Sequence, residues 1–163
     1  ARGVMLPPYD TRATLMRLGA LMRRYRPKRV ISLGDAFHDA EAETRMDEDD
    51  TAALAALMRE TDWLWVLGNH DPEPPARFAA ATEETVVIGA LTFRHEPLEG
   101  SAPGEIAGHL HPCARVMSEG RILRRRCFAE GADRLVMPAM GAFTGGLNIL
   151  DRAFSPLFTA PVA

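Results

Sequence analysis

The histidines of this chain lie where short apolar segments end, a pattern that indicates metal or phosphate chemistry. All five lie within or beside the ends of predicted strands, and none lies on a predicted helix. The polar stretch 68–71, Gly-Asn-His-Asp, follows the apolar run Trp63–Leu67, which is typical of a buried strand. Open α/β sheets place their sites at such carboxyl ends. An isolated stretch of this kind is equally consistent with a turn and a capping Asp, so the other strand ends decide.

Three predicted strands end in the same order: an apolar segment, a glycine and a residue that can ligate a metal ion. Glycine lets the backbone turn sharply and approach an ion or a phosphate closely. A fourth predicted strand ends at His95 without a glycine. The three glycine-containing pairs are Gly34 with Asp35, Gly68 with Asn69, and Gly108 with His109.

These strand ends offer oxygen and imidazole donors and no thiolate. That mixture favours Mn²⁺, Fe, Co, Ni or Zn over Ca²⁺, and it differs from a cysteine-rich structural zinc site. His109 and His111 are two residues apart on an extended segment, so they point to opposite sides and can serve two different ions. A carboxylate such as Asp35 can bridge two ions about 3.5–4 Å apart. The candidate ligands are Asp35, Asn69, His95, His109 and His111.

The elements that position these residues change in type along the chain. Helices and strands alternate in the first half, whereas antiparallel hairpins dominate the second, which predicts an α/β fold with two packed sheets and helices outside. We expect helices at 11–25 and 51–59 and a short segment at 76–81. We expect strands at 30–33, 63–67, 85–88, 91–95, 105–107, 115–117, 121–128, 135–137 and 148–150.

Length and composition predict one domain covering residues 1–163. A formal net charge of -3 creates no overall field that draws nucleic acid, so phosphate recognition must be local. No stretch approaches the ~18 apolar residues of a membrane span, and no signal peptide is visible. Cys113 and Cys127 fit a reducing compartment. We therefore expect a cytoplasmic protein without membrane contact.

Two charged stretches and one glycine-rich loop leave alternatives open. The acidic residues between 41 and 50 suit a solvated face better than a metal site, because no strand fixes them. The basic run 121–126 is either a charge-protected edge strand or a phosphate track, and Arg124 and Arg126 share one face of it. His38 is either a substrate contact or an ordinary loop histidine. The loop 138–146 either presents backbone N–H groups to a phosphate or makes a tight turn.

Taken in order, Gly34-Asp35, the stretch 68–71, His95 and the stretch 108–111 resemble the motifs of calcineurin-like metallophosphoesterases. The resemblance spans residues 30–112 and implies a four-layer α/β/β/α sandwich of two mixed β-sheets flanked by helices. Segments 7–11 and 138–148 are similar to the bacterial DNA-ligase-associated branch, described as Mn²⁺-dependent endonucleases and phosphodiesterases. The resemblance implies a hydrolase acting on phosphodiester bonds, possible single-stranded DNA as substrate, and a link in DNA repair to a DNA ligase and a helicase.

The resemblance also implies roles for individual residues. Asp35 would bridge two metal ions, Asn69, His95 and His109 would complete one site, and His111 would belong to the other. His70 would face the substrate phosphate as a proton donor or charge stabiliser, with Asp71 orienting it. A turn or helix-capping carboxylate is the alternative for Asp71.

One motif of the resembling family is absent. That family begins with an Asp-x-His motif on its first strand, and no such motif precedes Gly34. We therefore expect either that the domain lacks this first strand or that one metal site is incomplete. The alternative functions are a small-molecule phosphatase, a cyclic-nucleotide phosphodiesterase on the same site, and a non-catalytic scaffold with the same fold.

Overall fold

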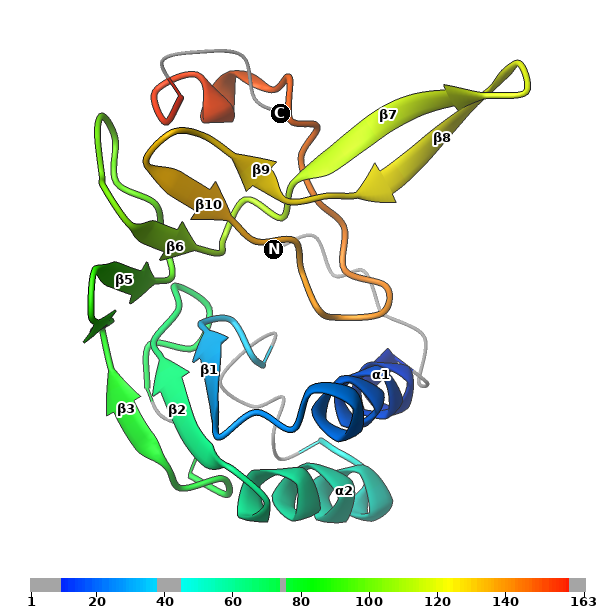
Figure 1. The fold of residues 1–163 in the computed structure, drawn as a ribbon. Coiled ribbons are helices and arrows are strands. Elements are labelled where there is room, and N and C mark those ends of the chain that lie inside the picture. The colour runs from blue at the N-terminus through cyan, green and yellow to red at the C-terminus, as the bar shows by residue number, and fades with distance from the viewer. Residues whose placement is uncertain (1–9, 38–44, 74–75, 159–163) are drawn as a thin grey trace.

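The structure, a computed structural model, describes residues 10–37, 45–73 and 76–158. Within these ranges two α-helices accompany three separate sheets, so the fold is mixed α/β as expected (Figure 1). The elements are α1 (Asp10–Tyr25), β1 (Arg29–Leu33), α2 (Glu48–Arg59), β2 (Asp62–Val66), β3 (Ala81–Glu83), β4 (Thr85–Ile88), β5 (Leu91–Arg94), β6 (Glu105–Ala107), β7 (Cys113–Ser118), β8 (Arg121–Arg126), β9 (Ala129–Glu130), β10 (Arg134–Val136) and the 3₁₀-helix η1 (Arg152–Phe154).

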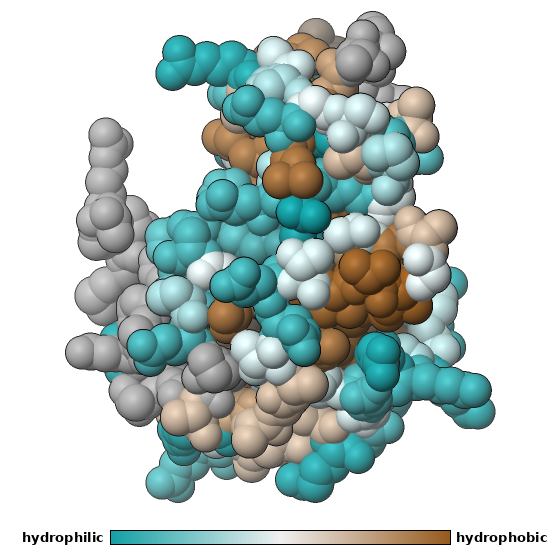
Figure 2. Space-filling model, turned by 90° about the vertical axis from the view of Figure 1, so that its left-hand side faces the viewer, coloured by the Kyte–Doolittle hydropathy of each residue, from teal (hydrophilic) through white to brown (hydrophobic). Residues whose placement is uncertain are grey.

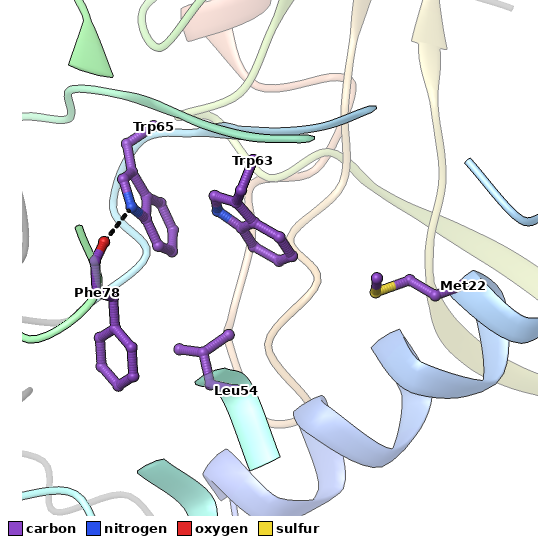
Figure 3. Packing of buried hydrophobic residues seen from close by; sticks show 5 residues of the cluster. All are labelled: Met22, Leu54, Trp63, Trp65 and Phe78. Carbon is purple, nitrogen blue, oxygen red and sulfur yellow. Dashed lines mark hydrogen bonds between the residues drawn. The ribbon is translucent and has the colours of Figure 1, made fainter. Parts of the chain in front are cut away.

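The first sheet consists of three parallel strands in the order β1-β2-β3. Its central strand β2 is apolar without alternation after Asp62 because both of its faces are buried. Alternate residues Trp63 and Trp65 point to one face, where they pack against side chains of α1 and α2. Figure 3 shows this cluster of Met22, Leu54, Trp63, Trp65 and Phe78. The two helices therefore cover one face of the first sheet.

The second sheet is mixed and has the strand order β4-β5-β6-β10-β9. Its inner face packs on the first sheet through Val86 and Phe93, which meet Leu64 and Val66 of β2. On its outer face Ala129 and Val136 pack against Phe154 of η1. The two sheets thus lie face to face, with the helices outside the first and η1 outside the second.

The β4–β5 hairpin forms one edge of the second sheet and leaves apolar side chains in contact with solvent. Figure 2 shows a hydrophobic patch on the side of the molecule where this hairpin lies. Val87, Ile88 and Leu91 are the exposed large apolar residues of the hairpin. The antiparallel pairing of β4 with β5 confirms the turn expected between residues 88 and 91.

The third sheet is a two-stranded ribbon in which β7 pairs with β8 along six residue pairs, from Cys113↔Arg126 to Ser118↔Arg121. Both turn residues, Glu119 and Gly120, have positive φ values of 49° and 74°, as tight hairpin turns require. The predicted hairpin is confirmed, although β7 begins earlier and β8 ends earlier than expected. Figure 1 shows the ribbon projecting away from the two larger sheets.

Helices α1 and α2 are joined by an ion pair that corrects one expectation. Asp50, in the first turn of α2, has a buried side chain (8% exposed) that accepts from Arg12 Nε at 2.9 Å. The acidic stretch is therefore not wholly a solvated face. Asp47 caps α2 by accepting from the Asp49 amide, which is why the helix begins at Glu48, earlier than predicted. No helix of the described residues is long and apolar enough to cross a membrane.

Other expectations were wrong in detail. Asn148 makes only an isolated bridge with Cys113, and the predicted strand at 148–150 is instead the approach to η1. Residues 81–83 form β3, which pairs with β2, whereas the sequence predicts a separate short segment at 76–81. The first sheet is parallel rather than mixed. Within the described ranges η1 is the only helical segment on the outer face of the second sheet, so the complete four-layer sandwich stays a prediction.

Replacing Trp65 by Phe should destabilise the protein more than replacing Trp63 by Phe. The Trp65 indole N–H donates to the Phe78 carbonyl at 2.9 Å, so Trp65→Phe leaves a buried acceptor unpaired. The Trp63 indole N–H has no hydrogen-bond partner among the described residues, and the two side chains are similarly buried. We expect the free energy of unfolding in urea to fall by about 1–2 kcal/mol more for Trp65→Phe. Equal losses would contradict this assignment.

Candidate metal centre

The core of the site is His95, which follows β5 of the second sheet and reaches the end of β1 in the first. Its Nδ1 atom lies 2.7 Å from the carbonyl oxygen of Leu33. A carbonyl oxygen only accepts hydrogen bonds, so Nδ1 carries the proton and Nε2 keeps its lone pair in the neutral ring. The side chain is buried, with 5% exposure. Leu33 therefore fixes both the orientation and the tautomer of His95.

The Nε2 atom of His95 faces three further donor atoms of potential ligands. Asn69 Oδ1 is 2.9 Å away, His109 Nδ1 is 3.1 Å away, and Asp35 Oδ2 is 3.2 Å away. Ligand atoms of Asp35, His95 and His109 all lie within 4.8 Å of one another. Atoms that carry lone pairs repel at such distances unless a proton or a cation lies between them. Two imidazoles, a carboxylate and an amide oxygen are a set that fits a divalent transition-metal ion.

Parallel pairing of β1 with β2 brings two of these residues together. Leu33 and Val66 are register partners at the ends of the two strands, so the segments that follow leave the sheet side by side. Asp35 and Asn69 lie on those segments, whereas His95 and His109 come from the second sheet, after β5 and β6. The predicted convergence of Asp35, Asn69, His95 and His109 is therefore present in the structure.

The backbone is strained at three predicted ligands. Asp35, His109 and His111 have φ values of 49°, 63° and 48°, a region that residues with a Cβ rarely adopt. The other such non-glycine residues of the described chain are Arg26 and Glu119. Strain of this kind persists where surrounding contacts hold it, and it concentrates at functional sites.

His111 lies near the group of three but is not part of it. Burial lowers the pKa of His111, while the nearby Asp35 carboxylate opposes this shift. His109, His95 and Arg126 lower the pKa further through their charges. The ring therefore stays neutral to a lower pH than an exposed histidine, which is the form that binds a metal.

Asp71 holds the two strand ends together through its carboxylate. Oδ1 accepts from the amides of Asp35 (2.8 Å) and Gly68 (3.1 Å), and Oδ2 accepts from Ala36 (2.7 Å) and Phe37 (3.2 Å). A carboxylate offers about four lone-pair directions, and backbone amides of described residues account for them here. The motif resemblance implied that Asp71 orients His70, and these contacts show it positioning the backbone around Asp35.

Gly68 permits this close approach of the two segments. A Cβ atom at Gly68 would overlap the amide and carboxylate of Asp35 and the carboxylate of Asp71. At Gly34, where φ is +78°, a Cβ would lie 2.5 Å from Nδ1 of His95. Gly34 and Gly68 are therefore required by packing against the ligands themselves.

His70 adjoins the centre through its backbone. Its side chain is exposed, and its backbone N–H donates to Asp35 Oδ1 at 2.9 Å. One oxygen of Asp35 thus accepts from His70 while the other faces His95. His70 does not belong to the group of ligand atoms formed by Asp35, His95 and His109.

Sequence reasoning missed Glu96. Its Oε1 lies 3.8 Å from Nε2 of His109, whereas the other ring nitrogen of His109, Nδ1, faces His95. A carboxylate at that place can orient a metal-binding imidazole. Its position directly after His95 was the signal available in the sequence. An open pocket of about 370 Å³ adjoins the site here and is lined by Leu67, Gly68, Asn69, Glu84, Thr85, Arg94, His95 and Glu96.

The residues predicted to touch substrate have different surroundings. His38 lies outside the described residues. Arg124 and Arg126 share one face of β8, as alternation predicted, and both donate to carbonyl groups of the loop 138–146. Two amides of this loop are already bound, because Ala142 donates to Thr14 Oγ1 and Phe143 donates to Asp10 Oδ1. The loop thereby connects the ribbon to α1.

Replacing Asp71 by Asn should loosen the site. An amide cannot accept from four N–H groups, so two charge-assisted hydrogen bonds are lost and an NH₂ group faces backbone donors. We expect the free energy of unfolding to fall by about 2–3 kcal/mol, measured by urea denaturation. Asp49→Asn is the matched control, because the Asp49 side chain is 87% exposed and should tolerate the change. Equal stability of the two variants would contradict the role given to Asp71.

Comparison with known proteins assigns the chain to a family. No family model matches the sequence, and no curated protein is similar to it. Among solved structures, the crystal structure of the Pseudomonas putida nuclease MPE has 30% identical residues and a TM-score of 0.76. The match covers 92% of this chain and 76% of that one. The chain belongs to the same family as the Pseudomonas putida nuclease MPE.

Proposed function

We propose that this protein is a metal-dependent phosphodiesterase that cleaves nucleic acid. The observation that supports this proposal is the convergence of Asp35, Asn69 and His109 on the Nε2 atom of His95. Similarity to a nuclease supports nucleic acid as the substrate class. The open pocket of about 370 Å³ beside Asn69 and His95 gives a phosphodiester room to approach.

We assign the ligands as the motif resemblance suggests. Asp35, Asn69, His95 and His109 would hold one divalent ion, and Asp35 with His111 would contribute to a second. Mn²⁺ is the proposed metal, since it suits mixed oxygen and imidazole donors. Such ions, when bound, supply activation of water and neutralisation of charge on the phosphoryl group.

The protein's own groups would supply orientation and proton transfer. The His70 ring would donate a proton to the leaving oxygen of the phosphodiester. Asp71 would keep this geometry by fixing the segments that carry Asp35 and His70. Glu96 would hold the His109 ring in its orientation.

The proposed enzyme class and substrate rest on the resemblance of the sequence motifs to those of calcineurin-like metallophosphoesterases. It supports placement in the calcineurin-like class and in its DNA-ligase-associated branch, with single-stranded DNA as substrate and a role in DNA repair beside a ligase and a helicase. A small-molecule phosphatase or a cyclic-nucleotide phosphodiesterase would share the same centre, because the loops around the ions choose the rest of the substrate. Comparing the rates of hydrolysis of DNA, phosphomonoesters and cyclic nucleotides therefore distinguishes these three activities.

Removing a ligand should abolish tight metal binding. We expect Asp35→Asn and His95→Ala to weaken Mn²⁺ binding, measured by isothermal titration calorimetry, by at least about 100-fold. Asp62→Asn is the control, because Asp62 pairs with Arg29 at the opposite end of β1 and β2. Binding should also weaken in acid as the histidines become protonated. Wild-type affinity in the Asp35 and His95 variants would contradict the assignment.

Replacing His70 by Ala should lower turnover while leaving metal binding intact. Loss of a general acid costs about 10²–10⁴-fold in rate. The assay follows hydrolysis of a single-stranded DNA oligonucleotide and of bis(p-nitrophenyl) phosphate in Mn²⁺, with and without EDTA. Glu73→Ala, exposed on the segment after His70, is the control and should retain activity.

Three outcomes would overturn parts of this proposal. Unchanged turnover in His70→Ala would remove its catalytic role. Rapid hydrolysis of nucleotides or phosphomonoesters without DNA cleavage would favour the phosphatase or cyclic-nucleotide alternatives. Absence of both turnover and Mn²⁺ binding in the wild type would favour a scaffold.

A further inference from the structure

The β7–β8 ribbon is held to the rest of the protein at its base. The Cys113 amide donates to Leu147 O at 2.7 Å, and the Cys113 carbonyl accepts from the Ile149 amide at 2.9 Å. Farther out each strand pairs only with the other. Figure 1 shows this outer part extending beyond the body of the molecule. Two-stranded ribbons without a packed face are marginal on their own, so an exposed one suggests a partner.

The ribbon concentrates positive charge in one short segment of the chain. Residues 113–126 contain five arginines and one glutamate, a net charge of +4 in a chain whose total is -3. The other residues together are therefore strongly negative. No carboxylate of the described chain forms an ion pair with any of these five arginines. The ribbon is thus a basic projection on an acidic body, and its complement is a polyanion.

Arginines lie on both faces of the ribbon. Arg115 and Arg124 are direct cross-strand partners on one face, an arrangement in which like charges destabilise the pair. Arg121 and Arg125 lie on the other face by alternation. Placing repelling charges opposite each other is costly to the isolated ribbon, and anionic groups on both sides would offset that cost.

The outer part of the ribbon also exposes apolar side chains. Met117 and Ile122 are register partners near the turn and are 73% and 67% exposed. Apolar residues at the end of a basic ribbon suit contact with bases or thymine methyl groups inside a groove. A second copy of the same ribbon fits poorly, because two projections of charge +4 repel each other.

The ribbon begins beside the metal centre. Only Pro112 separates the predicted ligand His111 from Cys113, the first residue of β7. Six residues per strand give a reach of about 20 Å. Phosphates along one strand of a duplex are spaced about 3.4 Å apart along the axis, so the ribbon spans several of them. Nucleic acid held along the ribbon would therefore lead to His111 and the centre.

We propose that the β7–β8 ribbon enters a groove of duplex nucleic acid and holds a duplex that adjoins the single-stranded cleavage site next to the metal centre. The major groove admits a two-stranded ribbon, and its walls place phosphates on both sides, where the arginines lie. This inference rests on the proposed nuclease function for its link to catalysis. The binding itself can be tested separately.

The decisive variant is Arg115→Ala/Arg121→Ala/Arg125→Ala. It leaves Arg124 and Arg126 in place because both hold the loop 138–146. The matched control, Arg17→Ala/Arg24→Ala/Arg59→Ala, removes three exposed helical arginines and the same charge. A third variant with lysine at 115, 121 and 125 keeps the charge. Binding to a fluorescent 20-base-pair DNA is measured by anisotropy in EDTA over a salt series, with thermal unfolding as a check on folding.

We expect the ribbon variant to bind the duplex at least about tenfold more weakly and to lower the log–log salt slope by about 2–3. The helical control should bind as the wild type does, and the lysine variant should keep most of the salt slope. Unchanged duplex affinity in the ribbon variant would overturn the proposal. So would loss of single-strand binding alone, or a change from dimer to monomer in sedimentation, which would make the ribbon an interface between copies.

Hydrolysis of bis(p-nitrophenyl) phosphate separates this inference from the proposed function. This small diester does not reach the outer ribbon, so the ribbon variant should hydrolyse it at the wild-type rate. If the wild type hydrolyses neither this diester nor DNA, but duplex binding still depends on the ribbon, the proposed function fails and the ribbon assignment stands. If hydrolysis is normal but duplex binding does not depend on the ribbon, the ribbon assignment fails and the proposed function stands.

Discussion

The hydrogen bond between His95 Nδ1 and the carbonyl of Leu33 joins the two large sheets at the point where the candidate ligands meet. It places a side chain of the second sheet at the end of a strand of the first. In the neutral ring it also leaves Nε2 with its lone pair, directed at Asn69, His109 and Asp35. Apolar contacts of Val86 and Phe93 with β2 bring the two sheets together, and this hydrogen bond sets where His95 lies relative to the first sheet. The centre therefore depends on how the sheets pack.

Hydrogen bonds from backbone amides to carboxylates, rather than apolar packing, hold the backbone around the centre. Asp71 gathers four amides from two segments, and Asp35 accepts from the amide of His70. Gly34 and Gly68 leave the space that these contacts need. Left-handed φ values at Asp35, His109 and His111 show the conformational cost of bringing the ligands to one place. At Asp35 the strain is balanced by hydrogen bonds that its amide and its carboxylate make with Asp71 and His70.

Features that depend on residues close together in the sequence could be predicted from it. The strand-glycine-ligand order predicted that Asp35, Asn69 and His109 would converge, and the apolar run 63–67 predicted a buried strand. Contacts between residues far apart in the sequence could not be predicted from it. The partners of Asp71 are backbone amides, which carry no side-chain signature, and the burial of Asp50 follows from Arg12 on another helix. β3 is short and partly polar, and it becomes a strand only because β2 offers an open edge. The predicted strand at 148–150 failed because apolar content alone does not supply a partner strand.

Anomalous X-ray diffraction from crystals soaked in Mn²⁺ tests the central claim most directly. The account predicts an anomalous peak about 2.0–2.3 Å from Asp35 Oδ2, Asn69 Oδ1, His95 Nε2 and a nitrogen of His109, with the His95–Leu33 hydrogen bond retained. An anomalous peak bound only by other residues would contradict it. So would full Mn²⁺ loading in solution with the His95 ring turned away from Asn69 in the crystal.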